Sequence, residues 1–349
     1  MMRLKLCNRR RSHVGVLLLF SVLLSQLTIA RALAGQSSSK KRKKQTHGGG
    51  FGKPAAGTKN AAEYIPDDSP AIRSLVKVLK EEECEGIGAE GGTEIGICST
   101  TGRRGLFAAD DYQAGELMLG IPFPCCVTLA MDDISVGEPS DAELGLRLLN
   151  LLSESEHRSC DKNCVDFAPY FQSFPTLEEN FDATPDFWTV PEIEQLELPF
   201  IIQRAMERKE SIGTLAQSQK VDQSQLQFAT WLVKSRGFTL LKPMVTPNLP
   251  THDTGDAIEE PVTTIVSKTV LIPYIDMINH CNPESANAEM QVLETKVEDE
   301  SFYALQATRF IRKGTEITIA YGTGKESTAD LLAGYGFIPS KNTNDAKFM

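Results

Sequence analysis

The sequence has no apolar run as long as the roughly 20 residues that a membrane-spanning helix needs. The longest run, Val14–Ile29, is interrupted by Ser21, Ser25 and Gln26. It follows the basic residues Arg9–Arg11 and precedes Ala32-Leu33-Ala34, a small-x-small cleavage site. We therefore interpret residues 1–34 as a cleaved signal peptide that leaves no permanent membrane span, with an uncleaved anchor as the alternative.

The sequence also lacks a second cysteine pair with the spacing of a zinc site. Cys160 and Cys164 have the spacing of half a metal site, but no other pair completes a zinc site. We therefore expect no metal centre and free thiols, with a Cys160–Cys164 disulfide as the alternative in an oxidising compartment. The other cysteines are Cys7, Cys84, Cys98, Cys125, Cys126 and Cys281.

Acidic residues are absent from residues 1–62, which hold 13 of the 36 Lys and Arg residues. Residues 63–349 therefore hold the other 23 basic residues and all 46 acidic ones, a balance of −23. A body this acidic is repelled by phosphate backbones, so nucleic acid is not an expected partner. A basic substrate, such as a lysine-bearing protein segment, suits this charge better.

The pattern of hydrophobic residues predicts strands, then helices, then strands again. This order predicts an α+β fold in which one discontinuous β-rich domain is split by a helical insert. We expect a basic disordered linker over 35–68, an N-terminal helix and the first β half over 69–130, the insert over 131–262, the second β half over 263–340 and a stub over 341–349. No internal repeat is visible.

The individual elements follow from periodicity, turn residues and helix-start signals. The predicted helices are Ser69–Glu83, one beginning at Asp141, Glu192–Glu210, Gln223–Arg236 and Ser327–Gly334. The predicted strands are Glu94–Cys98, Gly105–Ala109, Glu116–Ile121, Thr263–Ile272, Ser301–Ala307 and Glu316–Ala320, with a loop over Lys242–Pro261.

Two motifs carry the candidate chemistry. Ile272–Cys281 places an Asp, an Asn and a His on one short segment, and Ala320-Tyr321-Gly322 follows a predicted strand. Together they resemble the two signature motifs of SET-domain methyltransferases. Thr101–Ala109 resembles the opening segment of a SET domain. Four further segments resemble the branch that holds the plant Rubisco large-subunit lysine methyltransferase: Phe167–Pro175, Thr184–Trp188, Phe228–Phe238 and Tyr335–Pro339.

The resemblance implies transfer of a methyl group from S-adenosylmethionine to a protein lysine. A non-histone acceptor is favoured, because the zinc-binding cysteine cluster that follows many histone-directed SET domains is absent. A histidine acceptor on the same fold and a SET-like binding module without turnover are the alternatives. Relatives carry a further helical domain that binds the protein substrate, and we expect most of that domain to be missing after the stub at 341–349.

The resemblance also implies roles for individual residues. Tyr321 is the expected catalytic residue, whose hydroxyl orients the amine. Arg103 replaces the first glycine of the usual turn, and a positive φ there would cost about 1 kcal/mol or more. The residues expected to bind the cofactor are Gly102, Arg103, Arg104, Arg236, Asn279 and His280. Tyr335 is expected at the acceptor lysine, and Asp276 either there or as the cap of a turn.

The resemblance bears on location as well. A signal peptide followed by the acid-free, Ser-rich residues 35–62 is similar to the bipartite plastid address of algae with secondary plastids. We therefore expect entry by the secretory route and a final location in the plastid stroma. Lys40–Lys44 could instead act as a nuclear signal, and retention in the endoplasmic reticulum is a further alternative.

Overall fold

The computed structural model describes residues 64–133, 138–155, 165–177, 184–246, 262–295, 301–339 and 341–345. The chain divides after Lys59 into two units, and every described residue belongs to the second, Asn60–Met349. The predictions for the signal peptide, for residues 35–62 and for Cys160 and Cys164 lie outside the described residues. Within these ranges, no helix has the length and apolar character needed to cross a membrane.

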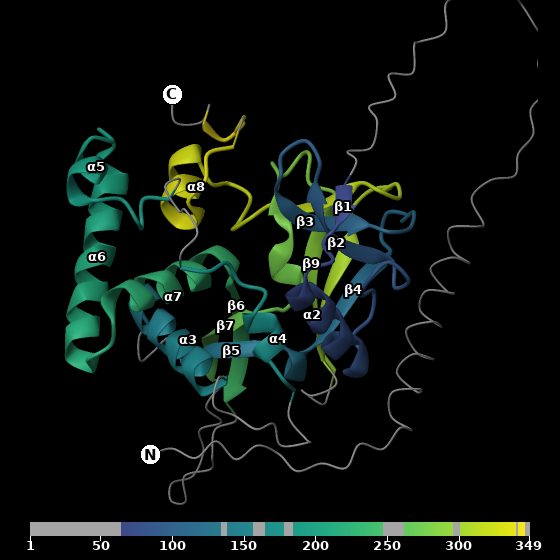
Figure 1. The fold of residues 1–349 in the computed structure, drawn as a ribbon, viewed down its shortest axis with the longest axis horizontal. Coiled ribbons are helices and arrows are strands. Elements are labelled where there is room, and N and C mark those ends of the chain that lie inside the picture. Colours follow the sequence, from purple (N-terminus) through teal and green to yellow (C-terminus); the bar gives the residue numbers. More distant parts are fainter. Residues whose placement is uncertain are drawn as a thin grey trace, which may run out of the picture. The chain divides into compact units, whose positions relative to one another are not determined.

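The described strands form three sheets (Figure 1). Each sheet joins strands that precede the helical segment to strands that follow it, so the β-rich part is discontinuous in sequence, as predicted. The first sheet has the order β1 (Tyr64–Pro66), β2 (Thr93–Cys98), β3 (Arg104–Ala108), β11 (Glu316–Ile319) and β8 (Asn279–His280). The second has β10 (Phe302–Ala307) between β4 (Leu117–Pro122) and β9 (Ala288–Leu293), and the third has β7 (Val262–Leu271) between β5 (Val127–Asp133) and β6 (Phe238–Thr246).

Most described helices lie in the sequence between β5 and β6, which confirms the helical insert and the α+β fold class. They are α3 (Asp141–Ser155), α4 (Ala168–Phe171), α5 (Val190–Glu194), α6 (Pro199–Gln219) and α7 (Gln223–Arg236). Outside this segment lie α2 (Pro70–Glu81), the 3₁₀ turns η1 (Phe123–Cys125) and η3 (Ile275–Met277), and α8 (Thr328–Tyr335). No observation tests the domain boundaries that we predicted.

The single helix predicted over Glu192–Glu210 is wrong. The structure has α5 and α6 there, separated by four residues. Glu197 has a φ of 53°, which a continuous right-handed helix does not allow. Pro199 then occupies the first position of α6, where its missing N–H has no intrahelical partner to lose.

The loop predicted over Lys242–Pro261 is wrong in its first part. β6 continues to Thr246 and pairs antiparallel with β7 along its whole length. The Pro-, Thr- and Asp-rich composition favoured a loop, and Pro243 removes a hydrogen-bond donor from the strand pairing. β6 is the edge strand of its sheet, and an edge strand tolerates proline. The rest of that loop lies outside the described residues.

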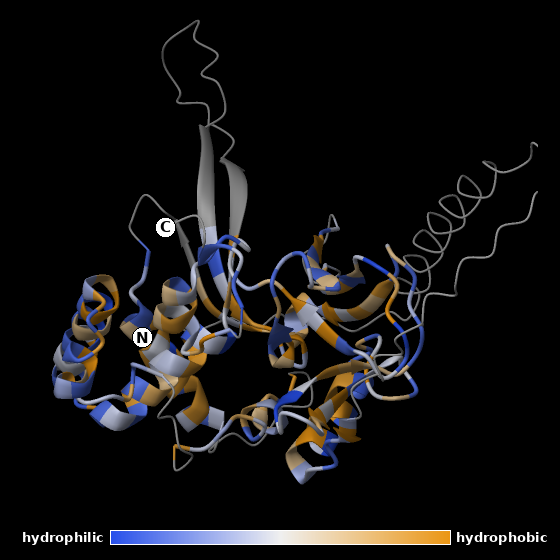
Figure 2. Cartoon of the chain, turned by 90° about the horizontal axis from the view of Figure 1, so that it is seen from above, coloured by the Kyte–Doolittle hydropathy of each residue, from blue (hydrophilic) through white to orange (hydrophobic). Residues whose placement is uncertain are grey.

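One hydrophobic cluster joins the sheets to the helices. It contains Leu75 of α2, Leu106 of β3, Ile121 of β4, Leu232 of α7 and Leu271 of β7, all at most 1% exposed. Figure 2 shows hydrophobic residues along the strands and hydrophilic ones along many of the connecting loops. The packed core therefore connects the end of α7 to the segment after β7, where the sequence placed the first signature motif.

Candidate active site

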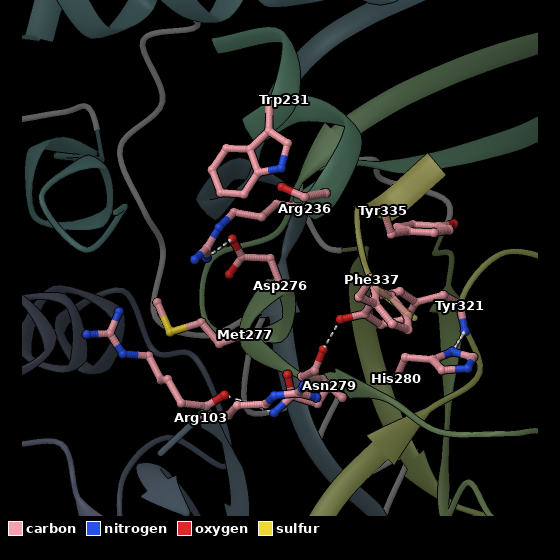
Figure 3. A pocket seen from close by; sticks show the side chains of 13 residues that line it. Arg103, Trp231, Arg236, Asp276, Met277, Asn279, His280, Tyr321, Tyr335 and Phe337 are labelled. Atoms are coloured by element: carbon pink, nitrogen blue, oxygen red, sulfur yellow. Dashed lines mark hydrogen bonds and ion pairs between the residues drawn. The ribbon is translucent and has the colours of Figure 1, made fainter. Parts of the chain in front are cut away.

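A cavity of about 370 Å³ lies where the end of α7, η3, β8 and the segment after β11 meet (Figure 3). This volume falls within the usual range for small-molecule sites. All the predicted site residues line it except Gly102. The lining residues are Arg103, Arg104, Trp231, Ser235, Arg236, Asp276, Met277, Ile278, Asn279, His280, Tyr321, Tyr335 and Phe337.

Tyr274 forms the turn that directs the first motif into this cavity. Its φ is 73°, in a region that costs a non-glycine residue about 1–3 kcal/mol. The side chain is fully buried, and its hydroxyl donates to the Thr93 carbonyl at 3.0 Å and accepts from the Gly88 N–H at 3.1 Å. These contacts hold the strained backbone, so the chain leaves β7 at an angle that places Asp276–His280 along the cavity.

Parallel pairing of β8 with β11 brings the two signature motifs together. His280 pairs with Ile319, two residues before Tyr321. The Tyr321 backbone N–H donates to His280 Nδ1 at 3.0 Å. Because Nδ1 accepts a hydrogen bond, a neutral His280 carries its proton on Nε2. Burial lowers the pKa of His280 and so favours this neutral form.

The Tyr321 hydroxyl lies at one end of the cavity among other rings. It donates to the Ile278 carbonyl at 2.5 Å. Its ring centroid is 5.0 Å from that of Tyr335, 5.3 Å from that of His280 and 6.1 Å from that of Phe337. Burial raises the pKa of Tyr321, which therefore stays protonated at neutral pH. The oxygen keeps its lone pairs for a group in the cavity.

A buried ion pair occupies the other end. Arg236 Nη1 lies 3.0 Å from Asp276 Oδ2, and the Tyr170 hydroxyl donates to the same oxygen at 2.8 Å. The Asp276 side chain is fully buried. Burial raises its pKa, and the positive charge of Arg236 opposes that rise. The Asp276 carboxylate therefore binds side chains of α7 and α4, and Oδ1 has no hydrogen-bond partner among the described residues.

The turn between β2 and β3 forms the edge of the cavity. Gly102 has a φ of 68°, and Arg103 is not among the described non-glycine residues with a positive φ. The strain considered for Arg103 therefore does not arise, since the glycine takes the left-handed conformation. The turn is closed by hydrogen bonds from Gly102 N–H to Cys98 O at 2.8 Å and from Cys98 N–H to Arg103 O at 2.9 Å.

The Asn279 side chain joins this turn to β11. Its Nδ2 donates to the Arg104 carbonyl at 2.9 Å and to Glu316 Oε1 at 2.7 Å. Gly105 makes room for the amide, since a Cβ there would lie 2.8 Å from Nδ2. The amide nitrogen of Asn279 therefore bonds to protein groups, while the residue as a whole still lines the cavity.

The sequence did not predict every residue of the site, because some motifs were recognised without a role for each side chain in them. Phe337 stands two residues after Tyr335 in a segment that had been recognised. Tyr170 does not line the cavity but holds Asp276 across 106 positions of sequence. Trp231 and Ser235 share α7 with Arg236, and the helical spacing of 231 and 235 to one another was the available signal.

The comparisons with known proteins point to one family. The SET domain family model matches residues 103–322, more than half of the chain. The fold is similar to a crystal structure of the SET domain of LSMT bound to lysine and AdoHcy, with a TM-score of 0.56 and 18% identity. That match covers 78% of this chain and 58% of the other.

A structure of Rubisco LSMT bound to AdoMet is also similar, with a TM-score of 0.52 and 18% identity over 78% of this chain and 57% of that one. The chain thus spans less than two thirds of the length of these solved proteins. At such low identity the likeness concerns the fold. A search of the curated proteins finds no match.

Proposed function

The chain belongs to the SET-domain family, and on that premise we propose that it transfers a methyl group from S-adenosylmethionine to a lysine side chain of a protein. The observation that carries the proposal is the position of the Tyr321 hydroxyl. It is partly buried, protonated and held by the Ile278 carbonyl at the aromatic end of a cavity whose other end holds Arg236.

The residues of the cavity fit this cofactor. Arg236 has five N–H donors, of which one on Nη1 faces Asp276, and its planar fork suits a carboxylate. His280 Nε2 is buried without a hydrogen-bond partner among the described residues, so its N–H suits an acceptor on a ligand. Asp276 Oδ1 suits an ammonium or amine. The backbone of Gly102–Arg104 and of Asn279–His280 would hold the rest of the molecule.

When bound, S-adenosylmethionine supplies an electrophilic methyl group to a neutral amine aligned with it. Tyr321 orients that amine, because its own proton is engaged by Ile278 and its oxygen can accept from the amine N–H. Tyr335 and Phe337 stand beside it and exclude water from the acceptor. Their faces also attract a group that carries partial positive charge. The protein thus acts by positioning and electrostatics.

Label transfer tests this proposal directly. The full chain is incubated with methyl-labelled S-adenosylmethionine and free L-lysine, a probe that needs only the cavity and no further substrate-binding domain. We expect labelled methyllysine. Calorimetry on the same sample separates the alternatives: binding without label transfer would indicate a SET-like binding module, and absence of binding would refute the enzyme.

We further propose a non-histone protein with a basic segment as the natural acceptor, consistent with the balance of −23 over residues 63–349. Incubation of the enzyme with stromal proteins and with core histones, followed by mass spectrometry, compares the two classes. The same spectra distinguish methyllysine from methylhistidine. Preferential methylation of histones, or of histidine, would overturn this part of the proposal.

For location we propose the plastid stroma, reached through the secretory route, on the basis of residues 1–62 alone. A fusion of this segment to a fluorescent protein in an alga with secondary plastids tests it. Fluorescence restricted to the nucleus or to the endoplasmic reticulum would refute the plastid assignment.

A further inference from the structure

A buried ion cluster in the helical insert lies outside the cavity and has no role in the mechanism above. Asp186 is 6% exposed. Its carboxylate pairs with Arg208 of α6 and, at 3.6 Å, with Lys234 of α7. The Thr184 hydroxyl donates to the same carboxylate at 3.0 Å. The two cations are 11% and 9% exposed, so the three charged groups form one buried unit.

Both cations of this cluster reach the same carbonyl of α8. Arg208 Nη2 donates to the Ala333 carbonyl at 3.2 Å, and Lys234 Nζ donates to it at 3.0 Å. Ala333 lies in the last turn of α8, where exposed carbonyls favour positive charge. Figure 1 shows α8 above α7 and beside α6. The cluster therefore fixes the end of α8 from two helices, two residues before Tyr335.

The same cluster contacts the chain on the other side of Tyr335. Gly336 ends α8 with a φ of 79°, and a Cβ on it would lie 2.6 Å from Cβ of Thr184. Thr184 is itself bonded to Asp186. The backbone between Tyr335 and Phe337 thus rests on the segment that carries the cluster's carboxylate, while both rings line the cavity.

We propose that the cluster of Asp186, Arg208 and Lys234 is a positioning device that sets Tyr335 and Phe337 as the walls of the acceptor channel. The inference rests on the proposed function, since it names how that site binds its acceptor. Hydrophobic residues of similar volume would stabilise the three helices at least as well as a buried ion cluster does. Unlike hydrophobic residues, the ion cluster donates directional hydrogen bonds to the Ala333 carbonyl, and these fix its orientation as well as its distance. Burial lowers the pKa of Lys234 to about 8, which shows that holding this charge has a cost.

The test replaces one cation and compares it with its neighbour. Lys234→Met removes a contact to Ala333. Lys209→Met is the matched control, because Lys209 donates to the Asp186 carbonyl at 3.0 Å and not to Ala333. With free L-lysine as acceptor, we expect Lys234→Met to raise KM about tenfold with kcat within about twofold, and Lys209→Met to leave both unchanged. Affinity for S-adenosylmethionine should be the same in all three proteins.

Amide hydrogen exchange at residues 335–337 gives a second measurement that does not need turnover. We expect exchange there to quicken about tenfold in Lys234→Met and not in Lys209→Met. Lys234→Arg keeps the charge and should restore most of the KM and the slow exchange. Unchanged KM and unchanged exchange in Lys234→Met, or equal effects of Lys209→Met, would overturn the proposal. If the wild-type protein transfers no label, the proposed function is refuted. Faster exchange in Lys234→Met would then still support the structural link from Lys234 to Tyr335.

Discussion

The two ends of the cavity are built in different ways. At the aromatic end, Tyr321, Tyr335, Phe337 and His280 contact one another through their rings, and the polar atoms of Tyr321 bond to Ile278 and His280 close by. At the polar end, Arg236 and Asp276 depend on one another and on a hydroxyl from α4. Figure 3 shows the two groups on opposite sides of the site.

The two ends therefore contribute different properties to the site: the aromatic end contributes shape, and the polar end contributes charge. The aromatic end holds no formal charge when His280 is neutral, so it can select an acceptor by fit and by the faces of its rings. The polar end holds a cation and an anion in a buried pair, and such a pair is costly to disturb. We therefore expect substitutions at the polar end to act first on folding, and substitutions at the aromatic end to act first on turnover.

Asp276→Ala should have the largest effect. It leaves Arg236, whose side chain is 16% exposed, buried without its counter-charge, which should lower the free energy of unfolding by about 3–5 kcal/mol. Urea denaturation measures this. Glu81→Ala is the control, since Glu81 pairs at 3.8 Å with Lys77 on the exposed face of α2 and its loss should change stability by less than about 1 kcal/mol. Equal, small losses in both variants would refute the contrast between the two ends.

Tyr321→Phe should act on turnover and not on folding. Loss of one hydroxyl that orients the reacting amine should lower turnover about 10²–10³-fold, while affinity for S-adenosylmethionine barely changes. Label transfer to free L-lysine and calorimetry measure the two quantities. Tyr64→Phe is the control, because that hydroxyl donates to Glu94 and does not line the cavity. Near-normal turnover in Tyr321→Phe would make the residue a packing residue.

The sequence predicts the aromatic end of the site better than the polar end, because the two ends are assembled differently. His280 and Tyr321 lie in two contiguous motifs joined by one strand pairing, so recognising the motifs also placed the residues. Tyr170 was missed, because its contact with Asp276 depends on where α4 packs and no local pattern encodes that. The Asp186 cluster was missed for the same reason, since its charges come from a turn and from two separate helices. The roles assigned to the individual site residues stay predictions until they are measured.

The fold shows the same division. Periodicity found α7 and the strands beside the motifs, because each buries one face in the common core. It failed where one residue overrides the pattern: Glu197 with its positive φ splits the expected helix, and Pro243 lies in an edge strand that tolerates it. Local sequence therefore predicted the elements better than their ends.

Gly105→Ala tests the link between the β2–β3 turn and β11, which lies between the two ends. A Cβ would lie 2.7 Å from Glu316 Oε1 and 2.8 Å from Asn279 Nδ2, so the variant should lose about 1–3 kcal/mol of stability by overpacking. Gly334→Ala is the control, because nothing lies within 4 Å of its Cβ and alanine favours the helix. Thermal unfolding compares the two variants. Equal melting temperatures would show that the side chains of Asn279 and Glu316 move aside without loss of stability.

His280→Asn should have the smallest effect and concerns pH alone. Asn Oδ1 can accept from the Tyr321 N–H in place of Nδ1, but it cannot titrate. Burial lowers the pKa of His280 below its ordinary 6.5, so the unfolded chain binds this proton first as pH falls. Because the unfolded state then holds more protons, wild-type stability should fall below pH 6.5 relative to the variant, and the two should run parallel above it. Urea denaturation from pH 5 to pH 8 measures the difference, in which the titration of the carboxylates common to both proteins cancels. A difference that is constant across this range would mean that His280 titrates alike in both states, and the aromatic end would then accept a charge that we infer it excludes.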